Sequence, residues 1–112
     1  MKKDTVAFPD FMKLDFRIGK VLKCEKLENS EKLLELTVDL GPDYGEVAIL
    51  TGLAQFYTPE DFTGKNFMFL ANLEPKPMAG KVSNGMLFAA DGPEKPILIE
   101  VSSEVVPGTI LR

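Results

Sequence analysis

The alternation of apolar and polar residues over 34–40 constrains the fold of this chain more than any other feature. Every second residue of this segment is leucine or valine, and the residues between them are polar or charged. A period of two is typical of an antiparallel strand with one face in the core and one face in water. Residues 41–45 contain a proline, an aspartate and two glycines, which predict a tight turn into another strand over 46–51.

Other segments extend this β pattern. We expect strands over 15–27, 66–73, 86–90 and 96–101. In the first of them the apolar alternation slips between Ile18 and Val21, and Gly19 marks the expected bulge or bend. The run 67–71 is continuously apolar, which is typical of a buried strand.

A short helix is predicted over 58–64, between the third and fourth strands. Thr58 is a suitable N-cap, Pro59 suits the first helical position, and Gly64 suits the C-terminal stop. The acidic pair Glu60 and Asp61 then lies at the positive end of the helix dipole. This structural role is a simpler explanation of the two carboxylates than catalysis or cation binding.

Five main strands with a short helix between the third and fourth predict an all-β fold with small α additions. We expect an OB-fold, a five-stranded Greek-key barrel, in a single domain over 1–112. The ligand surface of this fold comprises strands two and three and the loops that join strands 1–2 and 4–5. Here the first of these loops contains residues 29–32 and the second contains residues 72–86, so both carry candidate binding groups.

The composition argues against an enzyme. The chain has no histidine, which excludes Ser-His-Asp and Cys-His catalysis and His-containing zinc sites. Its single cysteine, Cys24, excludes Cys-x-x-Cys chemistry and is expected to be a buried small hydrophobe. Neither of the common glycine-rich phosphate motifs is present. We therefore expect no catalytic residue, no metal and no cofactor.

The charge is unevenly distributed along the chain. The net charge is −4, but residues 1–32 hold eight basic and six acidic residues, whereas residues 33–112 hold five basic and eleven acidic residues. The basic excess lies at Lys13, Arg17, Lys20, Lys23, Lys26 and Lys32. One interpretation is a solvated face with ordinary solubility charges. The other is a local anion-binding face, with modest affinity that falls steeply with salt.

The segment 72–86 has the chemistry of a polyanion-binding loop. It contains two lysines, two asparagines, a serine and two methionines, with a single acid, Glu74. It also contains two prolines and two glycines, so it is expected to lie at the surface on a strand scaffold. These groups suit the holding of phosphates and exposed bases better than the breaking of a bond.

Motifs along nearly the whole chain, from about Phe8 to Arg112, resemble one known family. They are Asp15–Val21 (DFRIGKV), Asn29–Leu33 (NSEKL), Val38–Gly41 (VDLG), Thr51–Leu53 (TGL), Tyr57–Glu60 (YTPE), Gly64–Lys65, Ala71–Leu73 with Pro75, Met78–Gly80 with Ser83, Gly85 and Met86, and Pro107–Gly108. In this order and spacing they resemble the tRNA-binding domain family. That family includes the C-terminal appendix of methionyl-tRNA synthetases, stand-alone tRNA-binding proteins and cytokine-like synthetase cofactors.

The resemblance implies an OB-fold that binds the outer corner of tRNA by shape, commonly as a homodimer. The residues that stand at the positions of the family's motifs are Lys32, Asn72, Ser83 and Met86. The candidate phosphate contacts are Arg17, Lys76 and Lys81. The sequence departs from the family pattern around Pro77, where related proteins often have a second basic residue, and Glu74 adds a negative charge nearby.

Each candidate also has a structural interpretation that the sequence leaves open. Any one lysine can be a solubility charge, and Asn72 can hydrogen-bond backbone groups. Ser83 can belong to a plain turn or offer its hydroxyl to a phosphate or a 2′-OH. Met86 can stack on a base or enter the core. The phenylalanines at 67, 69 and 88 lie within apolar runs and are expected in the core.

Apolar residues at the two ends of the chain lie outside the five strands. A helical turn over 8–14 is expected to dock Phe8, Phe11 and Leu14 on the body of the domain. Because a small open barrel leaves strand edges that must be paired or covered, segments 6–8 and 101–111 are predicted to form a homodimer interface.

The leading prediction is a non-catalytic, structure-selective tRNA-binding module that acts with or as part of methionyl-tRNA synthetase. The alternative is a chaperone-like or protein-interaction member of the same family, which the acidic balance favours. An enzyme comes last. The expected partners are tRNA, a second copy of the chain and the synthetase catalytic subunit. A cytoplasmic location is expected, because the chain has neither a membrane-length apolar run nor a signal-like start.

Overall fold

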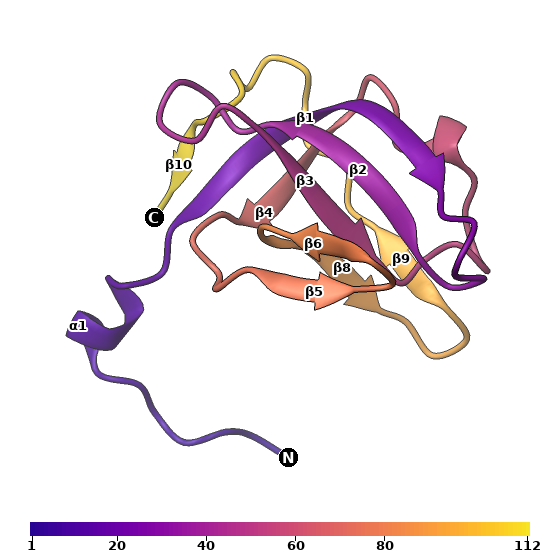
Figure 1. Cartoon of the computed structure of the whole chain (residues 1–112). Helices are drawn as coiled ribbons and strands as arrows, with labels where there is room; N and C mark the ends of the chain where they lie inside the picture. Colours follow the sequence, from indigo (N-terminus) through magenta and orange to yellow (C-terminus); the bar gives the residue numbers. More distant parts are fainter.

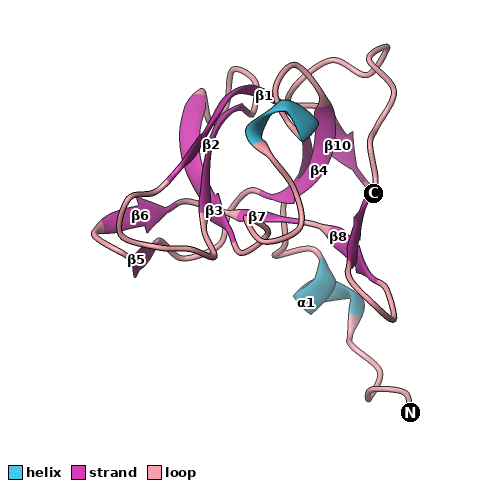
Figure 2. Ribbon diagram, turned by 90° about the vertical axis from the view of Figure 1, so that its right-hand side faces the viewer, coloured by secondary structure: helices cyan, strands magenta, loops and turns pink.

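A computed structural model describes residues 1–112 as an antiparallel sheet curled into a nearly closed barrel (Figure 1). The strand order is β3-β2-β1-β4-β7, and each neighbouring pair is antiparallel. These strands are β1 (Phe16–Lys26), β2 (Leu34–Asp39), β3 (Glu46–Thr51), β4 (Asn66–Leu70) and β7 (Met86–Leu87). The two outer strands, β3 and β7, approach each other and close the ring that Figure 2 shows. The predicted OB-fold is confirmed.

The predicted helix between β3 and β4 is a single 3₁₀ turn, η1 (Pro59–Asp61). Thr58 is its N-cap, and the Thr58 backbone N–H donates to the Asp61 carboxylate at 2.8 Å. The segment ends at Gly64, whose φ of 81° is a conformation that glycine adopts without strain. The N-cap Thr58 was therefore predicted correctly, whereas the C-cap is Phe62 rather than the predicted stop at Gly64, so the helix is shorter than expected.

The barrel interior is formed by the apolar face of the 34–40 alternation together with aromatic residues of the facing segments. The side chains with no exposed surface are Phe62, Phe67, Phe69, Leu34, Leu36, Leu40, Ile49, Val21 and Val38. Phe88 is half-buried and packs against Phe16, with ring centroids 5.7 Å apart. Cys24 is buried as expected, and this burial raises the pKa of its thiol to about 11.

The irregularity in β1 lies after Val21 rather than at Gly19, so the predicted bulge position was wrong. Residues 16–20 of β1 pair with β4, residues 20–26 pair with β2, and the register shifts between Val21 and Lys23. Gly19 has a packing role instead. A Cβ atom built on it would lie 2.6 Å from Val38 Cγ1, so only glycine lets the opposing side chain approach this closely.

The segment 72–86 contains a hairpin that the sequence analysis did not predict. Its strands are β5 (Lys76–Met78) and β6 (Lys81–Ser83), which pair antiparallel. The connecting residues Ala79 and Gly80 have φ values of 49° and 80°, the backbone of a two-residue type I′ turn. This turn favours Asn-Gly or Asp-Gly, and the Ala-Gly sequence gives a weaker signal.

Both predicted strands near the C-terminus are shorter than expected, because the chain leaves the barrel after Leu87. The segment 86–90 divides into β7 and β8 (Ala89–Asp91), and β8 pairs with β9 (Pro96–Leu98) in a separate hairpin. The chain then returns to the barrel, where β10 (Ile110–Leu111) pairs with the start of β1. The C-terminal segment therefore covers part of a strand edge within the same molecule.

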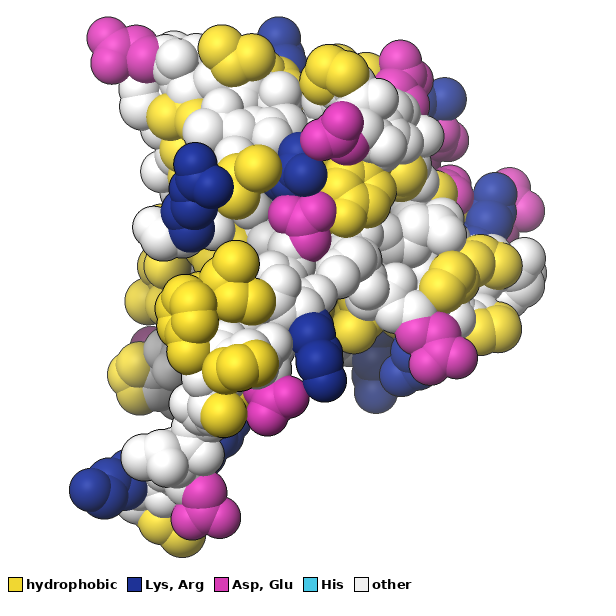
Figure 3. All heavy atoms as spheres, turned by 90° about the vertical axis from the view of Figure 1, so that its left-hand side faces the viewer, with side chains coloured by type: hydrophobic (Ala, Val, Ile, Leu, Met, Phe, Trp, Pro, Cys, Tyr) yellow, Lys and Arg dark blue, Asp and Glu magenta, His cyan; other side chains and the backbone are white.

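Residues 1–14, here named the N-terminal arm, project away from the barrel and include α1 (Phe8–Phe11) (Figure 1). The prediction that the turn docks its apolar side chains holds only for Phe11, whose ring stacks on Phe16 of β1 with centroids 6.0 Å apart, whereas Phe8 is 69% exposed and no residue of α1 is buried. Figure 3 shows hydrophobic side chains gathered where the arm joins the barrel. A four-residue helix has too little apolar surface to hold the arm against the barrel. None of the helices has the length and apolar character needed to span a membrane.

Candidate nucleic-acid interface

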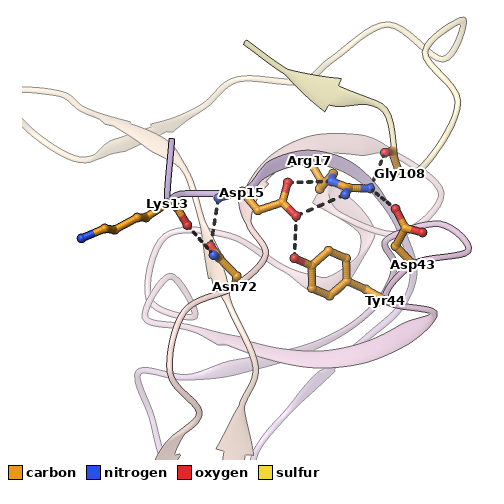
Figure 4. A network of polar contacts seen from close by, with 7 residues as sticks. All are labelled: Lys13, Asp15, Arg17, Asp43, Tyr44, Asn72 and Gly108. Atoms are coloured by element: carbon orange, nitrogen blue, oxygen red, sulfur yellow. Dashed lines mark hydrogen bonds and ion pairs between the residues drawn. The ribbon is translucent and has the colours of Figure 1, made fainter. Parts of the chain in front are cut away.

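Arg17 lies at one end of the barrel, where β1 begins, and is held by a network of polar contacts (Figure 4). Its Nε and Nη2 donate to the two carboxylate oxygens of Asp15 at 2.7 and 3.2 Å. Its Nη1 donates to Asp43 Oδ2 and to the Gly108 carbonyl oxygen, both at 3.1 Å. The guanidinium therefore joins three separate parts of the chain. We call this group, completed by Tyr44, the arginine end.

Tyr44 completes the arginine end from the turn between β2 and β3. Its hydroxyl donates to the Asp15 carboxylate, and the Arg17 guanidinium lies over its ring, 5.3 Å from the centroid. The hydrogen bond from Arg17, assisted by the one from Tyr44, holds the pKa of Asp15 below its ordinary value despite partial desolvation. Arg17 is only 8% exposed. This geometry removes Arg17 from the set of candidate phosphate contacts, because its charge is already matched inside the protein.

Asn72 uses its side chain to hold the backbone of the segment that precedes β1. Its Nδ2 donates to the Lys13 carbonyl oxygen at 2.7 Å, and its Oδ1 accepts from the Asp15 N–H at 2.9 Å (Figure 4). Both ends of the amide are thus engaged with backbone. The structure places Asn72 beside the arginine end, in agreement with the structural interpretation of this residue.

Ser83 closes the barrel and is only 3% exposed. Its Oγ accepts from the Leu50 N–H at 3.0 Å and donates to the Gly85 carbonyl oxygen at 3.1 Å. Beside it, the Asn84 N–H donates to the Ala48 carbonyl oxygen at 2.9 Å. The serine hydroxyl thus takes the place of a backbone carbonyl as the acceptor for β3, at the point where β3 lies beside the residues that precede β7. A hydroxyl this deeply buried is not presented to a 2′-OH or a phosphate.

At the opposite end of the barrel, the two predicted binding loops meet. A groove of about 310 Å³ lies between residues 27–29, from the loop after β1, and the tip of the β5–β6 hairpin. Glu25, Glu35 and Lys81 line it as well, and Lys81 Nζ lies 3.6 Å from Glu35 Oε1. We call the loop 27–33, the β5–β6 hairpin and this groove the lysine end.

Three cations of the lysine end differ in their surroundings. Lys32 and Lys76 are exposed and take part in no ion pair, whereas Lys81 is partly neutralised by Glu35. The backbone of Lys32 is fixed, because its N–H donates to Ser30 Oγ at 3.2 Å. Met86, on β7, is 41% exposed, so the structure does not place it in the core.

The outer face of the sheet between the two ends carries charges of both signs. Glu25 of β1 lies directly opposite Glu35 of β2, and Lys20 lies opposite Asp39. Lys23 Nζ contacts Glu25 Oε1 at 2.8 Å, and this hydrogen bond lowers the pKa of Glu25. Because this face holds no excess of positive charge, attraction for an anion has to come from the loop lysines.

The sequence analysis did not identify the acidic partners of these cations. Glu35 is a polar residue of the 34–40 alternation, which indicates its outward direction but not the lysine that it meets. Asp43 and Tyr44 belong to the predicted turn 41–45, and their contact with Arg17 spans 26 residues or more of sequence. Local sequence patterns carry no signal for such pairs.

An OB-fold barrel with two loops that meet in a charged groove at one end defines a class of ligand-binding module. Residues 16–110 match a family model described as "Putative tRNA binding domain". The chain belongs to this family. The resemblance of its motifs is thereby confirmed.

The chain is also similar to part of several methionine–tRNA ligases. It is 44% identical over 108 residues to the enzyme of Archaeoglobus fulgidus, which is 96% of this chain and 16% of the ligase. It is 41% identical over 107 residues to the enzyme of Thermotoga maritima, which is 96% of this chain and 17% of the ligase. The chain therefore spans about one sixth of the length of these relatives.

Two solved structures of similar length share the fold. A MetRS-related protein from Pyrococcus horikoshii superposes with a TM-score of 0.91 at 37% identity, covering 98% of this chain and 100% of the other. The chaperone CsaA from Bacillus anthracis superposes with a TM-score of 0.84 at 26% identity, covering 97% and 100%. The solved structures that share this fold therefore include one named as a MetRS-related protein and one named as a chaperone.

Proposed function

We propose that this chain is a non-catalytic, structure-selective tRNA-binding module that acts with or as part of a methionyl-tRNA synthetase. The family match across 16–110 carries this proposal, and the similarity to methionine–tRNA ligases supports the choice of synthetase. A module of this kind raises the local concentration of tRNA near a catalytic subunit. Work beside a synthetase would place the protein in the cytoplasm.

We assign the proposed contacts according to exposure. Lys32, Lys76 and Lys81 would meet phosphates as point charges, because their ammonium groups are exposed at the lysine end. Met86 would pack on a ribose or base edge. Contacts to phosphate position a nucleic acid without reading its sequence, so recognition by the lysines follows the shape of the backbone. Arg17, Asn72 and Ser83 act on this binding only by holding the scaffold.

The first test is the affinity for unfractionated tRNA across a salt series, beside a duplex RNA of equal charge. We expect preference for tRNA, with the logarithm of the affinity falling linearly with the logarithm of salt. Lys32→Met or Lys81→Met should each reduce the slope by about one unit, because each removes one phosphate contact. Lys65→Met is the matched control, since Lys65 pairs with Glu100 away from both loops. Absence of tRNA binding at low salt would contradict the proposal.

A second candidate function is a chaperone-like or protein-interaction role. The similarity to CsaA at 26% identity favours it, as does the net charge of −4. It predicts binding of an unfolded polypeptide and no salt-dependent retention of tRNA. Competition between tRNA and a reduced, unfolded test protein for the same molecule distinguishes the two functions. Displacement of tRNA by the polypeptide would mean that the two ligands bind to the same surface of the protein.

We also propose that the chain forms a homodimer through its terminal segments. Phe8, Met12, Leu14 and Ile110 are all large apolar residues that are more than 36% exposed. A cavity of about 350 Å³ lies between the arm and the C-terminal segment, lined by Phe11, Leu14 and Leu111 among others. A two-fold dimer would cover this surface and present two lysine ends to one tRNA.

Sedimentation at micromolar concentration tests the dimer. Phe8→Glu and Ile110→Glu should both yield a monomer, because each buries a charge in the proposed interface. Val82→Glu is the matched control, since Val82 is 46% exposed on the hairpin, away from the terminal segments. A wild-type protein that sediments as a monomer would contradict this part of the proposal.

A further inference from the structure

Phe56 is the only exposed aromatic side chain outside the N-terminal arm. It is 44% exposed, whereas the other aromatic residues of the barrel are buried or half-buried. It also has no aromatic neighbour, unlike Phe8 and Phe11, whose rings lie 6.0 Å apart. A single exposed apolar residue is ordinary by itself. Phe56 differs from such a residue in two ways: its backbone is held by hydrogen bonds, and its turn lies beside the loop that carries Lys32.

The backbone that carries Phe56 is held by several contacts. The N–H groups of Phe56 and Tyr57 both donate to the carbonyl oxygen of Leu53 at 3.0 Å, and Leu53 is buried. The Tyr57 hydroxyl donates to the Pro96 carbonyl oxygen at 2.7 Å, and its ring packs edge-on against Phe62. The exposed ring thus rises from a backbone that is already ordered, which lowers the entropy lost when a flat ligand packs on it.

The same segment is joined to the loop that carries Lys32. The Ala54 N–H donates to the Lys32 carbonyl oxygen at 3.0 Å. This hydrogen bond places the turn 53–57 beside the loop 27–33, so an exposed ring and an unpaired ammonium group lie on neighbouring, rigidly connected loops. One group suits the face of a nucleobase and the other suits the phosphate attached to it.

We propose that Phe56 is a stacking site for an unpaired nucleobase, with Lys32 contacting the adjoining phosphate. This inference rests on the proposed tRNA function and extends it, because it adds a base contact to recognition by the phosphates alone. Every base has a π face, so the contact selects for an accessible base and not for its identity. The lysine end would then distinguish a folded RNA with exposed bases from a continuous duplex.

Geometry favours a nucleotide over an apolar protein segment as the occupant. The ring stands alone, with no exposed apolar residue beside it in the turn 53–57, so it offers one flat contact rather than a hydrophobic groove. Lys32 adds a positive charge that an apolar segment would have to desolvate without compensation.

The test compares wild type, Phe56→Ala, Phe56→Leu and Phe56→Trp by fluorescence anisotropy with labelled tRNA and with a duplex RNA at one fixed salt concentration. We expect Phe56→Ala and Phe56→Leu to weaken tRNA binding about 5- to 100-fold, the range for loss of one stacked base. Phe56→Trp should bind at least as well as wild type, and duplex binding should not change. Because no phosphate contact is removed, the salt slope of Phe56→Ala should equal that of wild type.

Ile99→Ala is the matched control, because Ile99 is 58% exposed and has no aromatic ring. Thermal unfolding of each variant checks that the fold is retained. If wild type binds tRNA and Phe56→Ala binds it equally well, the stacking site is overturned and the tRNA function stands. If wild type binds no tRNA, the proposed function itself fails. Loss of polypeptide binding by Phe56→Ala with unchanged tRNA binding would assign the ring to a protein partner and overturn the inference.

Discussion

The two ends of the barrel use similar cations in opposite ways. At the arginine end, Arg17 donates four hydrogen bonds, and two carboxylates balance its charge. At the lysine end, Lys32 and Lys76 are exposed and have no ion-pair partner. One end fastens the chain together, whereas the other leaves charge available for a ligand.

The difference follows from the chemistry of the two side chains and from their burial. A guanidinium is planar and donates along fixed directions, so it suits a site where carboxylates and a carbonyl converge. An ammonium group on a flexible stem keeps its hydration and contacts a phosphate as a point charge. Positive charge alone therefore does not identify a binding residue in this protein. For this reason we propose as binding residues only the lysines whose charge is not fully matched by internal partners.

Replacing the two cations gives the largest expected difference between the ends. Arg17→Met should lower the free energy of unfolding by about 2–3 kcal/mol, because Asp15 loses its partner in a largely buried position. Lys32→Met should change it by less than about 0.5 kcal/mol, as at other exposed positions. Urea unfolding measures both. Equal effects in the two variants would remove the distinction between the ends.

Replacing Ser83 gives the next largest expected effect on stability. It also distinguishes a structural role from an RNA contact within the β5–β6 hairpin. Ser83→Ala should cost about 1–2 kcal/mol of stability, because the buried Leu50 N–H loses its acceptor. The tRNA affinity of the folded variant at one fixed salt concentration should stay at the wild-type value, whereas Lys81→Met lowers both the affinity and the salt slope. Ser103→Ala, in an exposed loop, is the control for stability. A lower tRNA affinity in folded Ser83→Ala would show that the serine contacts the RNA after all.

A substitution at Glu35 tests whether its ion pair with Lys81 restrains that lysine from contacting phosphate. Glu35→Gln should raise tRNA affinity up to about 5-fold at low salt, because it frees Lys81, and the gain should shrink as salt screens the pair. In a Lys81→Met background the same change should have a smaller effect. Glu100→Gln is the control for the loss of one negative charge. Additive effects of the two changes would mean that the ion pair does not restrain Lys81.

The smallest expected effect is the loss of stability at low pH through protonation of Asp15. The hydrogen bond from Arg17 lowers the pKa of Asp15 from its ordinary 3.8. A lowered folded-state pKa contributes stability that is present above the ordinary value and is lost as pH falls through the folded value. The free energy of unfolding should therefore fall more steeply below about pH 4 in wild type than in Asp15→Asn. Parallel curves for the two proteins would show that Asp15 does not stabilise the arginine end as described.

Local features of the sequence determined the kind of fold. The alternation over 34–40 produced β2 and its buried face, because a strand repeats every two residues wherever it lies. The N-cap Thr58 and the proline that follows it determined where η1 begins, since a cap acts within one turn. The motifs then indicated the family. Each of these signals depends only on neighbours in the chain.

The tertiary structure decided which of the candidate residues are free to bind. Arg17 meets Asp43 and Gly108 across 26 and 91 residues of sequence, and Ser83 meets Leu50 across 33. The β5–β6 hairpin, the projecting arm and the neighbouring positions of Phe56 and Lys32 were also not evident from the sequence. The identity of a cationic, hydroxyl or aromatic residue in the sequence does not reveal whether its partner lies inside the protein or in a ligand. Only the packing of distant segments assigns that partner, and with it the division between scaffold and surface.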